Sequence, residues 1–214
     1  VFWILNGLSK KMLIGDYIAV NFIDRVFGDP LRHTGFENLM ALYGYSLQVY
    51  ADFSGYTDIA IGVALLMGFH LPENFNSPYK ARNVSEFWQR WHISLSTWLR
   101  DYLYIPMGGN RVGSLFSWVM LGVVGIALVL LTGWLWLPVV FLSVFAFAVV
   151  MIQISPGSQK FITTNLNLMI TMLIGGLWHG ASWMFVIWGG LNGLGLVVYK
   201  QWKKFSPWEK STKW

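Results

Sequence analysis

Hydrophobic residues fill most of the chain, and their spacing predicts a series of helices. Residues 1–8 are apolar and end at Ser9-Lys10-Lys11. Apolar positions then recur at helical spacing up to Phe27, with the charged residues off that stripe, and Gly28-Asp29-Pro30 follows. This pattern predicts an amphipathic helix at a membrane interface. A short, partly buried core helix fits the same spacing.

The apolar segment from Leu39 to Leu71 is interrupted by the run Asp52-Phe53-Ser54-Gly55-Tyr56-Thr57-Asp58. Each flanking piece is shorter than the roughly 20 residues that a membrane-spanning helix needs. We therefore expect two short helices around a polar break, as occurs where backbone lines a cavity or packs on protein. Asp52 and Asp58 then either line a cavity or pair with basic side chains. Pairing is favoured because acidic groups in a membrane usually have partners.

Residues 80–111 predict an amphipathic helix after a turn-rich connection at 71–78. Asn83 followed by Glu86 is typical of a helix N-cap with its reciprocal acid. At about 100° per residue, one face of this helix is apolar; it carries Trp88, Trp91, Leu95, Trp98, Leu99 and Tyr102. His92 lies at the edge of that face, where a satisfied interfacial histidine is the simplest interpretation. The segment's excess of basic residues favours the cytoplasmic side of a membrane.

Two apolar stretches, Leu115–Leu131 and Trp134–Ile152, flank Thr132-Gly133. They predict a two-helix membrane hairpin within residues 114–160. Neither stretch contains an ionisable residue, so the hairpin is predicted to pack and not to carry chemistry.

The last apolar run, Leu166–Tyr199, is too long for one ordinary span and short for two. If Lys160 and Lys200 lie on one side of the membrane, the chain turns back between them and His179 lies near the turn. Small residues on the second half permit close helix packing; they are Gly189, Gly190, Gly193 and Gly195.

His179 is the single ionisable residue of this run. An ionisable side chain within the membrane is energetically costly and therefore indicates function by default. Imidazole is also the side chain best suited to move a proton near neutral pH. Gly175, Gly176 and Gly180 leave room around it for a substrate or another backbone. A buried histidine bonded to a neighbouring helix is the alternative.

Composition places the chain among all-α integral membrane proteins. Of its 214 residues 55% are hydrophobic and only 12% are charged, whereas soluble domains carry about 25% charged residues. There is no cysteine, which excludes disulfides, thiolate zinc sites and cysteine nucleophiles within these residues. The net charge of +5 comes from basic residues near span ends, so it indicates topology and not nucleic-acid binding. A start at Val1 without an initiator methionine suggests a piece of a longer protein.

Several long motifs resemble the membrane-bound O-acyltransferase (MBOAT) family, in its alginate O-acetyltransferase branch, with the teichoic-acid D-alanyl transfer proteins related. The motifs are Phe87-Trp88-Gln89-Arg90-Trp91-His92-Ile93-Ser94-Leu95-Ser96-Thr97-Trp98-Leu99-Arg100-Asp101-Tyr102, Tyr104-Ile105-Pro106-Met107-Gly108-Gly109-Asn110-Arg111, Asp52-Phe53-Ser54-Gly55-Tyr56-Thr57-Asp58, Pro72-Glu73-Asn74-Phe75 and Gly176-Leu177-Trp178-His179-Gly180-Ala181-Ser182-Trp183. The resemblance covers roughly residues 3–204, and family proteins are about twice as long. One departure is an insertion near 114–160, which has an even number of expected spans and so preserves topology.

The resemblance implies a multi-span helical ring around a funnel, with broken and interfacial helices and residues 1–214 forming part of a single membrane domain. His179 matches the family's catalytic histidine, and His92 matches a second functional histidine. The same motifs supply candidate site-lining residues, namely Trp178, Trp88, Trp91, Asp52, Ser54, Arg90, Asp101 and Asn110. No metal site is expected, because the four histidines lack zinc-type spacing.

The family further implies a bacterial multi-pass protein of the cytoplasmic (inner) membrane, in contact with membrane lipid. It would take an acyl group, expected to be acetyl, from a cytoplasmic thioester such as acetyl-CoA or an acyl carrier. No bound cofactor is expected. The group would pass outward to an extracytoplasmic acetyltransferase of the SGNH type, working with polysaccharide export machinery. The product would be an O-acetylated exopolysaccharide or cell-wall polymer, as in alginate biosynthesis.

Acyl transfer to a hydroxyl needs a base and a group that polarises the acyl carbonyl. We assign His179 as the base, with His92 polarising the carbonyl or orienting the acceptor. Direct transfer is favoured over an acyl-enzyme, since no Gly-x-Ser-x-Gly elbow or cysteine is present. Two other classes fit the broken helices and intramembrane charges: a polytopic transporter or channel, and a non-catalytic scaffold of a polysaccharide-modifying complex.

Overall fold

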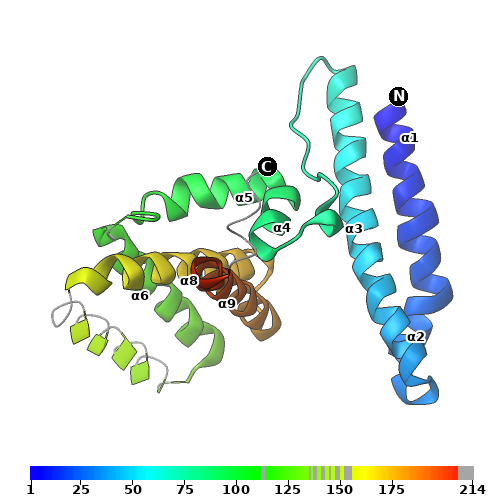
Figure 1. Ribbon diagram of the computed structural model, residues 1–214. Coiled ribbons are helices and arrows are strands. Elements are labelled where there is room, and N and C mark those ends of the chain that lie inside the picture. The colour runs from blue at the N-terminus through cyan, green and yellow to red at the C-terminus, as the bar shows by residue number, and fades with distance from the viewer. Residues whose placement is uncertain are drawn as a thin grey trace. The chain divides into compact units, whose positions relative to one another are not determined.

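The computed structural model describes residues 1–111, 114–134 and 156–206, together with 136, 139–140, 143–144, 146–147 and 150–151. These residues are almost entirely helical, which confirms the all-α prediction for the described part of the chain. They form two compact units (Figure 1). The first contains Val1–Ser77 and Arg90–Ser94, and the second contains Pro78–Gln89 and the chain from Leu95 onward.

The first unit begins with a helical run from Phe2 to Gly28. It passes through α1 (Phe2–Ser9), the π-helical segments η1 (Lys10–Asp16) and η2 (Ala19–Ile23), and α2 (Asp24–Gly28). The helical run continues through Ser9-Lys10-Lys11, where the apolar stretch ends. Ile23 and Val26 are each only 1% exposed, which supports the core-helix interpretation of this stretch.

The second long element of this unit is α3 (Gly35–Leu66), which packs alongside α1 (Figure 1). Thr34 and Glu37 form a capping box at its start. The helix then continues for 32 residues, so the predicted break at Asp52–Asp58 is wrong. The polar residues there remain helical because the preceding helix supplies their partners.

Lysine–aspartate pairs join the two helices. Asp58 accepts hydrogen bonds from Lys10 Nζ and from Asn6 Nδ2, each at 2.7 Å. Lys11 Nζ lies 2.7 Å from Asp52 Oδ1. The prediction that both aspartates pair with basic residues is thus confirmed. Because the lysines neutralise the aspartates, α3 can continue through Asp52–Asp58 without a polar break.

The second unit is assembled from shorter elements and one helical hairpin. It contains most of α4 (Val84–Arg90) and of α5 (Ile93–Leu99). Its other helices are η5 (Arg100–Tyr104), α6 (Leu115–Thr132), α8 (Gln159–His179) and α9 (Trp183–Phe205), with short 3-10 turns at η4 (Pro78–Lys80) and η6 (Pro156–Ser158). Asn83 Oδ1 accepts the Glu86 N–H at 2.8 Å, which confirms the predicted N-cap. The reciprocal bond differs, because Glu86 Oε2 accepts from Arg82 N–H at 3.0 Å. The amphipathic helix expected from Asn83 onward is interrupted between α4 and α5.

The helices α8 and α9 confirm that the last apolar run turns back on itself. Gly180 to Ser182 form the turn, and the two helices then pack closely (Figure 1). A Cβ atom on Gly189 would lie 2.5 Å from the Met172 carbonyl oxygen, so a side chain there would force the helices apart. Gly176 and Gly193 make similarly close contacts, as predicted for small residues.

The helix α6 packs on this hairpin through a buried apolar cluster. Its members include Leu103, Met107, Leu121, Val124 and Ile170. The helix ends at Gly133, whose φ of +65° gives a left-handed cap. Nearly half of the partner stretch, Trp134–Ile152, lies outside the described residues, so the complete hairpin stays a prediction.

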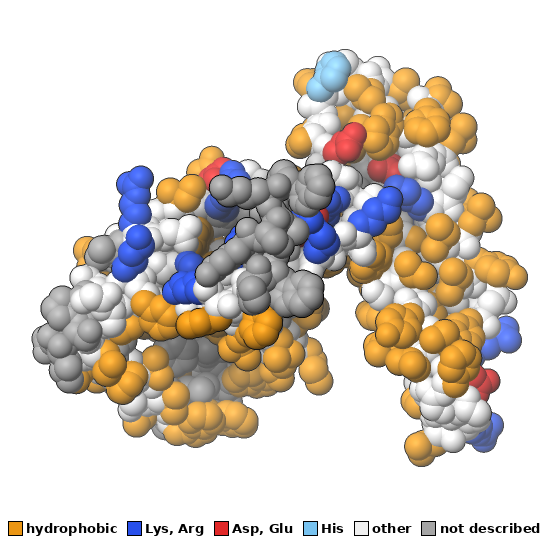
Figure 2. All heavy atoms as spheres, viewed as in Figure 1, with side chains coloured by type: hydrophobic (Ala, Val, Ile, Leu, Met, Phe, Trp, Pro, Cys, Tyr) orange, Lys and Arg blue, Asp and Glu red, His pale blue; other side chains and the backbone are white. Residues whose placement is uncertain are grey.

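By length and composition, one described helix, α8, is suited to cross a membrane. A shorter apolar stretch, Leu115–Ala127, lies within α6. Elsewhere large apolar side chains cover much of the surface of the described residues (Figure 2), including Leu42, Tyr43 and Leu66 on α3. The multi-span ring remains an expectation for the longer protein.

Candidate active site

His179 is the last residue of α8, directly before the turn, and its side chain is exposed in this chain. Its Nδ1 lies 2.7 Å from the Gly175 carbonyl oxygen. A carbonyl oxygen can only accept, so Nδ1 carries the proton. In the neutral ring Nε2 then holds the lone pair and can take a proton from a substrate hydroxyl.

Aromatic rings surround this imidazole. The Trp178 ring is nearly perpendicular to it at 5.1 Å between centroids. From α9, Trp188 approaches to 4.9 Å and Phe185 to 5.9 Å. Gly180 makes room for Phe185, because a Cβ atom on this glycine would lie 2.8 Å from the Phe185 ring. The rings restrict the orientation of His179 and shield it from part of the solvent.

Sequence reasoning missed Phe185 and Trp188. Both lie in the first two turns of α9, so they return close to His179 once the turn is placed at residues 180–182. Trp88 from α4 joins the same cluster, with its ring 5.6 Å from Trp188. Trp88 Nε1 is buried and has no hydrogen-bond partner among the described residues.

His92 lies in the first unit, between α4 and α5. Its backbone has φ +43°, in the left-handed region. Its ring meets the Phe53 ring edge-to-face at 4.7 Å. Beside it, Trp91 packs on Phe75 at 5.0 Å, and Arg90 Nη1 donates to the Asn76 carbonyl at 3.1 Å.

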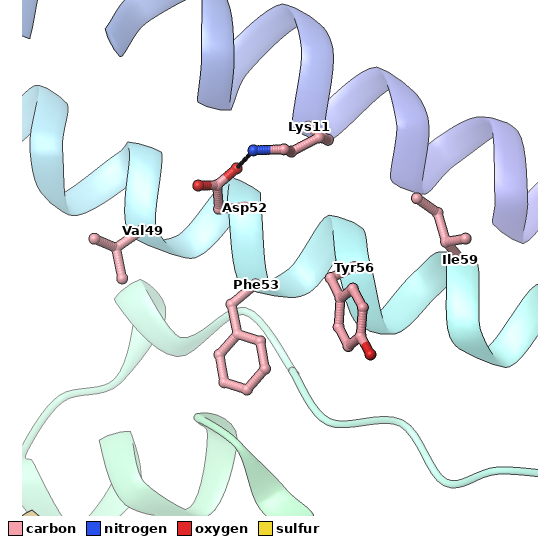
Figure 3. A pocket seen from close by; sticks show the side chains of 6 residues that line it. All are labelled: Lys11, Val49, Asp52, Phe53, Tyr56 and Ile59. Atoms are coloured by element: carbon pink, nitrogen blue, oxygen red, sulfur yellow. Dashed lines mark hydrogen bonds and ion pairs between the residues drawn. The ribbon is translucent and has the colours of Figure 1, made fainter. Parts of the chain in front are cut away.

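A cavity of about 630 Å³ opens beside α3 in this unit (Figure 3). It is lined by Lys11, Val49, Asp52, Phe53, Tyr56 and Ile59. Phe53 and Tyr56 point away from the helix that carries Lys11, whereas Asp52 points toward Lys11. Lys11 Nζ also lies 2.8 Å from Asp16. Asp52 therefore does both things that the sequence allowed, pairing with a lysine and lining a cavity.

Ser54 is fully buried on α3, and its hydroxyl has no hydrogen-bond partner among the described residues. Asp101 forms an exposed ion pair with Arg100 at 2.7 Å. These two candidates therefore differ in exposure, because Ser54 is closed off from solvent and Asp101 is open to it.

Asn110 joins the Gly108-Gly109 turn to the far end of the hairpin. Its Oδ1 accepts hydrogen bonds from Tyr104 Oη at 2.9 Å and Lys200 Nζ at 2.8 Å. Burial raises the pKa of Tyr104 to about 12, so this hydroxyl stays protonated and donates. Asn167 Nδ2 holds the same turn through the Met107 carbonyl at 2.9 Å. Asn167 lies twelve residues before His179 on α8, which is about 18 Å along the helix.

The structure thus gathers the candidates in two groups. His92, Trp91, Arg90, Asp52 and Ser54 belong to the first unit, and His179, Trp178, Trp88, Asp101 and Asn110 belong to the second. Within the described ranges, no three histidine or acidic side chains converge as metal ligands would.

Comparison with known proteins adds an independent line of evidence. A sequence model of the MBOAT, membrane-bound O-acyltransferase family, matches residues 17–166. The probable alginate O-acetylase AlgI of Pseudomonas fluorescens is 40% identical over 92% of this chain and 30% of its own length. The peptidoglycan O-acetyltransferase of Helicobacter pylori is 39% identical over 91% of this chain and 28% of its own. The teichoic acid D-alanyltransferase of Bacillus subtilis is 28% identical over 99% of this chain and 44% of its own. The chain therefore spans less than half the length of these relatives.

Proposed function

The chain belongs to the membrane-bound O-acyltransferase family, and we propose that the protein containing it moves an acyl group, most simply acetyl, from a cytoplasmic thioester across the membrane for O-acetylation of a polysaccharide. The observation that carries this proposal is the His179 site. An imidazole with Nδ1 bonded to the Gly175 carbonyl presents Nε2 as a base. It lies at the end of the described helix best suited to a membrane. Relatives that carry O-acetyltransferase names share this sequence at about 40% identity.

In the proposed reaction, His179 Nε2 takes the proton of the acceptor hydroxyl as its oxygen attacks the thioester carbonyl. The C–S bond then breaks, and the proton passes to the departing thiolate. His92 polarises the acyl carbonyl or orients the acceptor. General-base catalysis supplies about 10²–10⁴-fold in rate, and the remainder comes from holding donor and acceptor in line.

The donor, direction and partners follow from the family resemblance. A cytoplasmic acyl thioester, either acetyl-CoA or an acyl carrier, gives up its acyl group at the inner membrane. The group then passes outward to an extracytoplasmic acetyltransferase of the SGNH type, which works with the polysaccharide export machinery. The full-length protein would surround the site with the further helices of a multi-span ring, in contact with membrane lipid.

Substitution of His179 in the full-length protein tests the proposal. His179→Gln keeps hydrogen-bonding groups but cannot take a proton at neutral pH. We expect it to lower acetylation of the exported polysaccharide at least about 100-fold, as loss of a general base does, and His179→Ala to do the same. His92→Gln is expected to reduce transfer less, because an amide can still orient a group.

The matched control is His70→Gln, which changes an exposed histidine of the first unit. It should leave acetylation and membrane protein level unchanged. Near-normal acetylation by a stably inserted His179→Gln protein would remove the proposed base. The scaffold or transporter alternatives would then account better for this chain.

A further inference from the structure

The chain turns sharply at His92. The helix α4 ends at Arg90 and α5 begins at Ile93, and His92 between them has φ +43°. Side-chain-bearing residues are uncommon in this left-handed region. Such a conformation persists only where neighbouring structure holds it. Neighbouring residues must therefore hold His92 in this conformation.

The short segment Asn74 to Asn76 runs antiparallel to the turn and bonds to both of its sides. The Asn76 N–H donates to the Arg90 carbonyl at 2.9 Å, before His92. The Asn74 carbonyl accepts the Ile93 N–H at 3.0 Å, after His92. Between them, Phe75 pairs with Trp91 in an isolated bridge.

The Asn74 side chain adds a third bond at the start of α5. Its Oδ1 accepts the Ser94 N–H at 3.0 Å. The first N–H groups of a helix have no partner within it, and asparagine is among the best residues for supplying one. Asn74 therefore bonds the two residues after His92, one through its backbone and one through its side chain.

Aromatic contacts carry this support to the imidazole itself. The Phe75 ring lies 5.2 Å from Phe53, and Phe53 meets the His92 ring at 4.7 Å with an interplanar angle of 82°. Asn74 fixes the backbone on which His92 stands, and Phe53 limits the directions that its ring can take.

We propose that Asn74 is a positioning residue for His92. It touches no substrate and acts by capping α5 so that the left-handed turn, and with it the imidazole, keeps one orientation. This inference rests on the proposed function only where transfer is measured, because the orientation of His92 can be followed without any reaction.

The first test measures the chemical reactivity of His92 in purified full-length protein. Diethyl pyrocarbonate modifies accessible imidazoles, and mass spectrometry gives the rate at each histidine. For Asn74→Ala we expect the rate at His92 to rise about fivefold, the change in population that loss of an N-cap typically gives. The rates at His33, His70 and His179 should stay unchanged and serve as internal controls.

Two further variants separate positioning from a general structural role. Asn74→Asp keeps an acceptor oxygen at the same place and should restore the His92 rate. Asn74→Gln keeps the amide but moves it by one methylene, so the His92 rate should rise as it does in Asn74→Ala. If Asn74→Ala prevents folding, Asn74→Gln takes its place in the test. Asn76→Ala keeps the backbone bond to Arg90 and should leave the His92 rate near wild type.

The second readout is acetyl transfer at equal membrane protein level. Asn74→Ala should lower transfer about tenfold or more, as a small misplacement of a catalytic group does, and Asn74→Asp should restore it. An unchanged His92 rate in both Asn74→Ala and Asn74→Gln would overturn the inference, whatever the transfer rates. Failure of the proposed function would look different: the His92 rate would still change, while neither Asn74 nor His179 variants affected transfer.

Discussion

At the scale of single residues, the geometry of the candidate site assigns separate tasks to its members. The Gly175 carbonyl fixes which nitrogen of His179 is free, and α9 supplies the rings that limit its rotation. Trp188 contacts both His179 and Trp88, so it connects the catalytic candidate to α4. The sequence did not single out this tryptophan.

We predict that Trp188→Ala lowers acetyl transfer in the full-length protein by about 10-fold to 100-fold through misplacement of His179. Trp188→Phe keeps a ring and should retain most of the activity. Trp202→Ala, an exposed tryptophan on the same helix, is the matched control and should be nearly neutral. Equal transfer by the Trp188→Ala and Trp202→Ala proteins would show that this ring does not orient His179.

The lysine–aspartate pairs give a second prediction at this scale. Asp58→Ala leaves Lys10 and Asn6 without their shared acceptor. Asp58 is only 7% exposed, so water replaces the lost carboxylate poorly. We expect the free energy of unfolding to fall by about 1.5–3 kcal/mol, as for hydrogen bonds to charged groups. Asp16→Ala breaks an exposed pair of Lys11, and should cost less than about 1 kcal/mol. Thermal unfolding in detergent measures both, and equal losses would contradict the structural difference.

At the scale of elements, short sequence patterns predicted those features that depend on neighbouring residues in the chain. The N-cap at Asn83 follows from a short-range signal and is confirmed, and the turn after His179 is confirmed as well. The run at Asp52–Asp58 was misread as a break because its partners, Lys10 and Lys11, lie more than 40 residues earlier in the chain. A single stretch of sequence cannot show such long-range compensation.

The interruption at His92 was missed for the same reason. Helical periodicity continues through Trp91 and His92, so a pattern analysis extends the helix across them. Bonds from Asn74 and Asn76, which lie well before Asn83, make the interruption favourable. The motifs supplied the candidate site residues, whereas the side chains that surround them depend on these distant contacts.

The close packing of α8 and α9 leads to a prediction for adjacent glycines. A Cβ atom on Gly189 would lie 2.5 Å from the Met172 carbonyl, whereas one on Gly190 would meet only Leu173 Cδ2 at 3.8 Å. Gly189→Ala should therefore destabilise the protein by about 1–3 kcal/mol through overpacking and reduce transfer. Gly190→Ala should be neutral or stabilising by up to about 1 kcal/mol, because alanine favours helix.

Thermal unfolding and acetyl transfer of the two proteins, measured side by side, check this prediction. A Gly189→Ala protein that is as stable and as active as the Gly190→Ala protein would contradict the prediction. That result would mean that the hairpin adjusts to an added methyl group without moving His179.

At the scale of the whole molecule, the charges indicate how the chain is oriented. Lys160 lies in the first turn of α8 and Lys200 near the end of α9, so the antiparallel hairpin places both lysines at the same end of the two helices. Burial, together with the charges of Lys204 and Lys160, lowers the pKa of Lys200. Basic residues favour the cytoplasmic face, and the segment 80–111 carries the same excess.

We predict that single cysteines introduced as Ser85→Cys, Lys160→Cys and Lys203→Cys face the cytoplasm. These 214 residues contain no cysteine, so each label would be unique once any others in the full-length protein are replaced. An impermeant thiol reagent should modify them only after the cells are permeabilised. Labelling of Ser85→Cys in intact cells would reverse the orientation proposed for this segment.

The bonds between α1 and α3 also have a consequence for how the protein is made. In lipid an isolated lysine or aspartate costs about 2.5–3.5 kcal/mol to insert. Lys10 and Lys11 leave the ribosome before Asp52 and Asp58 exist, so the first helix is a poor substrate for insertion until the second arrives. The two helices should therefore enter the bilayer as a neutral pair. Ribosome-stalled chains that are expressed from Val1 and end before Asp52 should remain extractable by alkaline carbonate, and chains that extend past Asp58 should resist it.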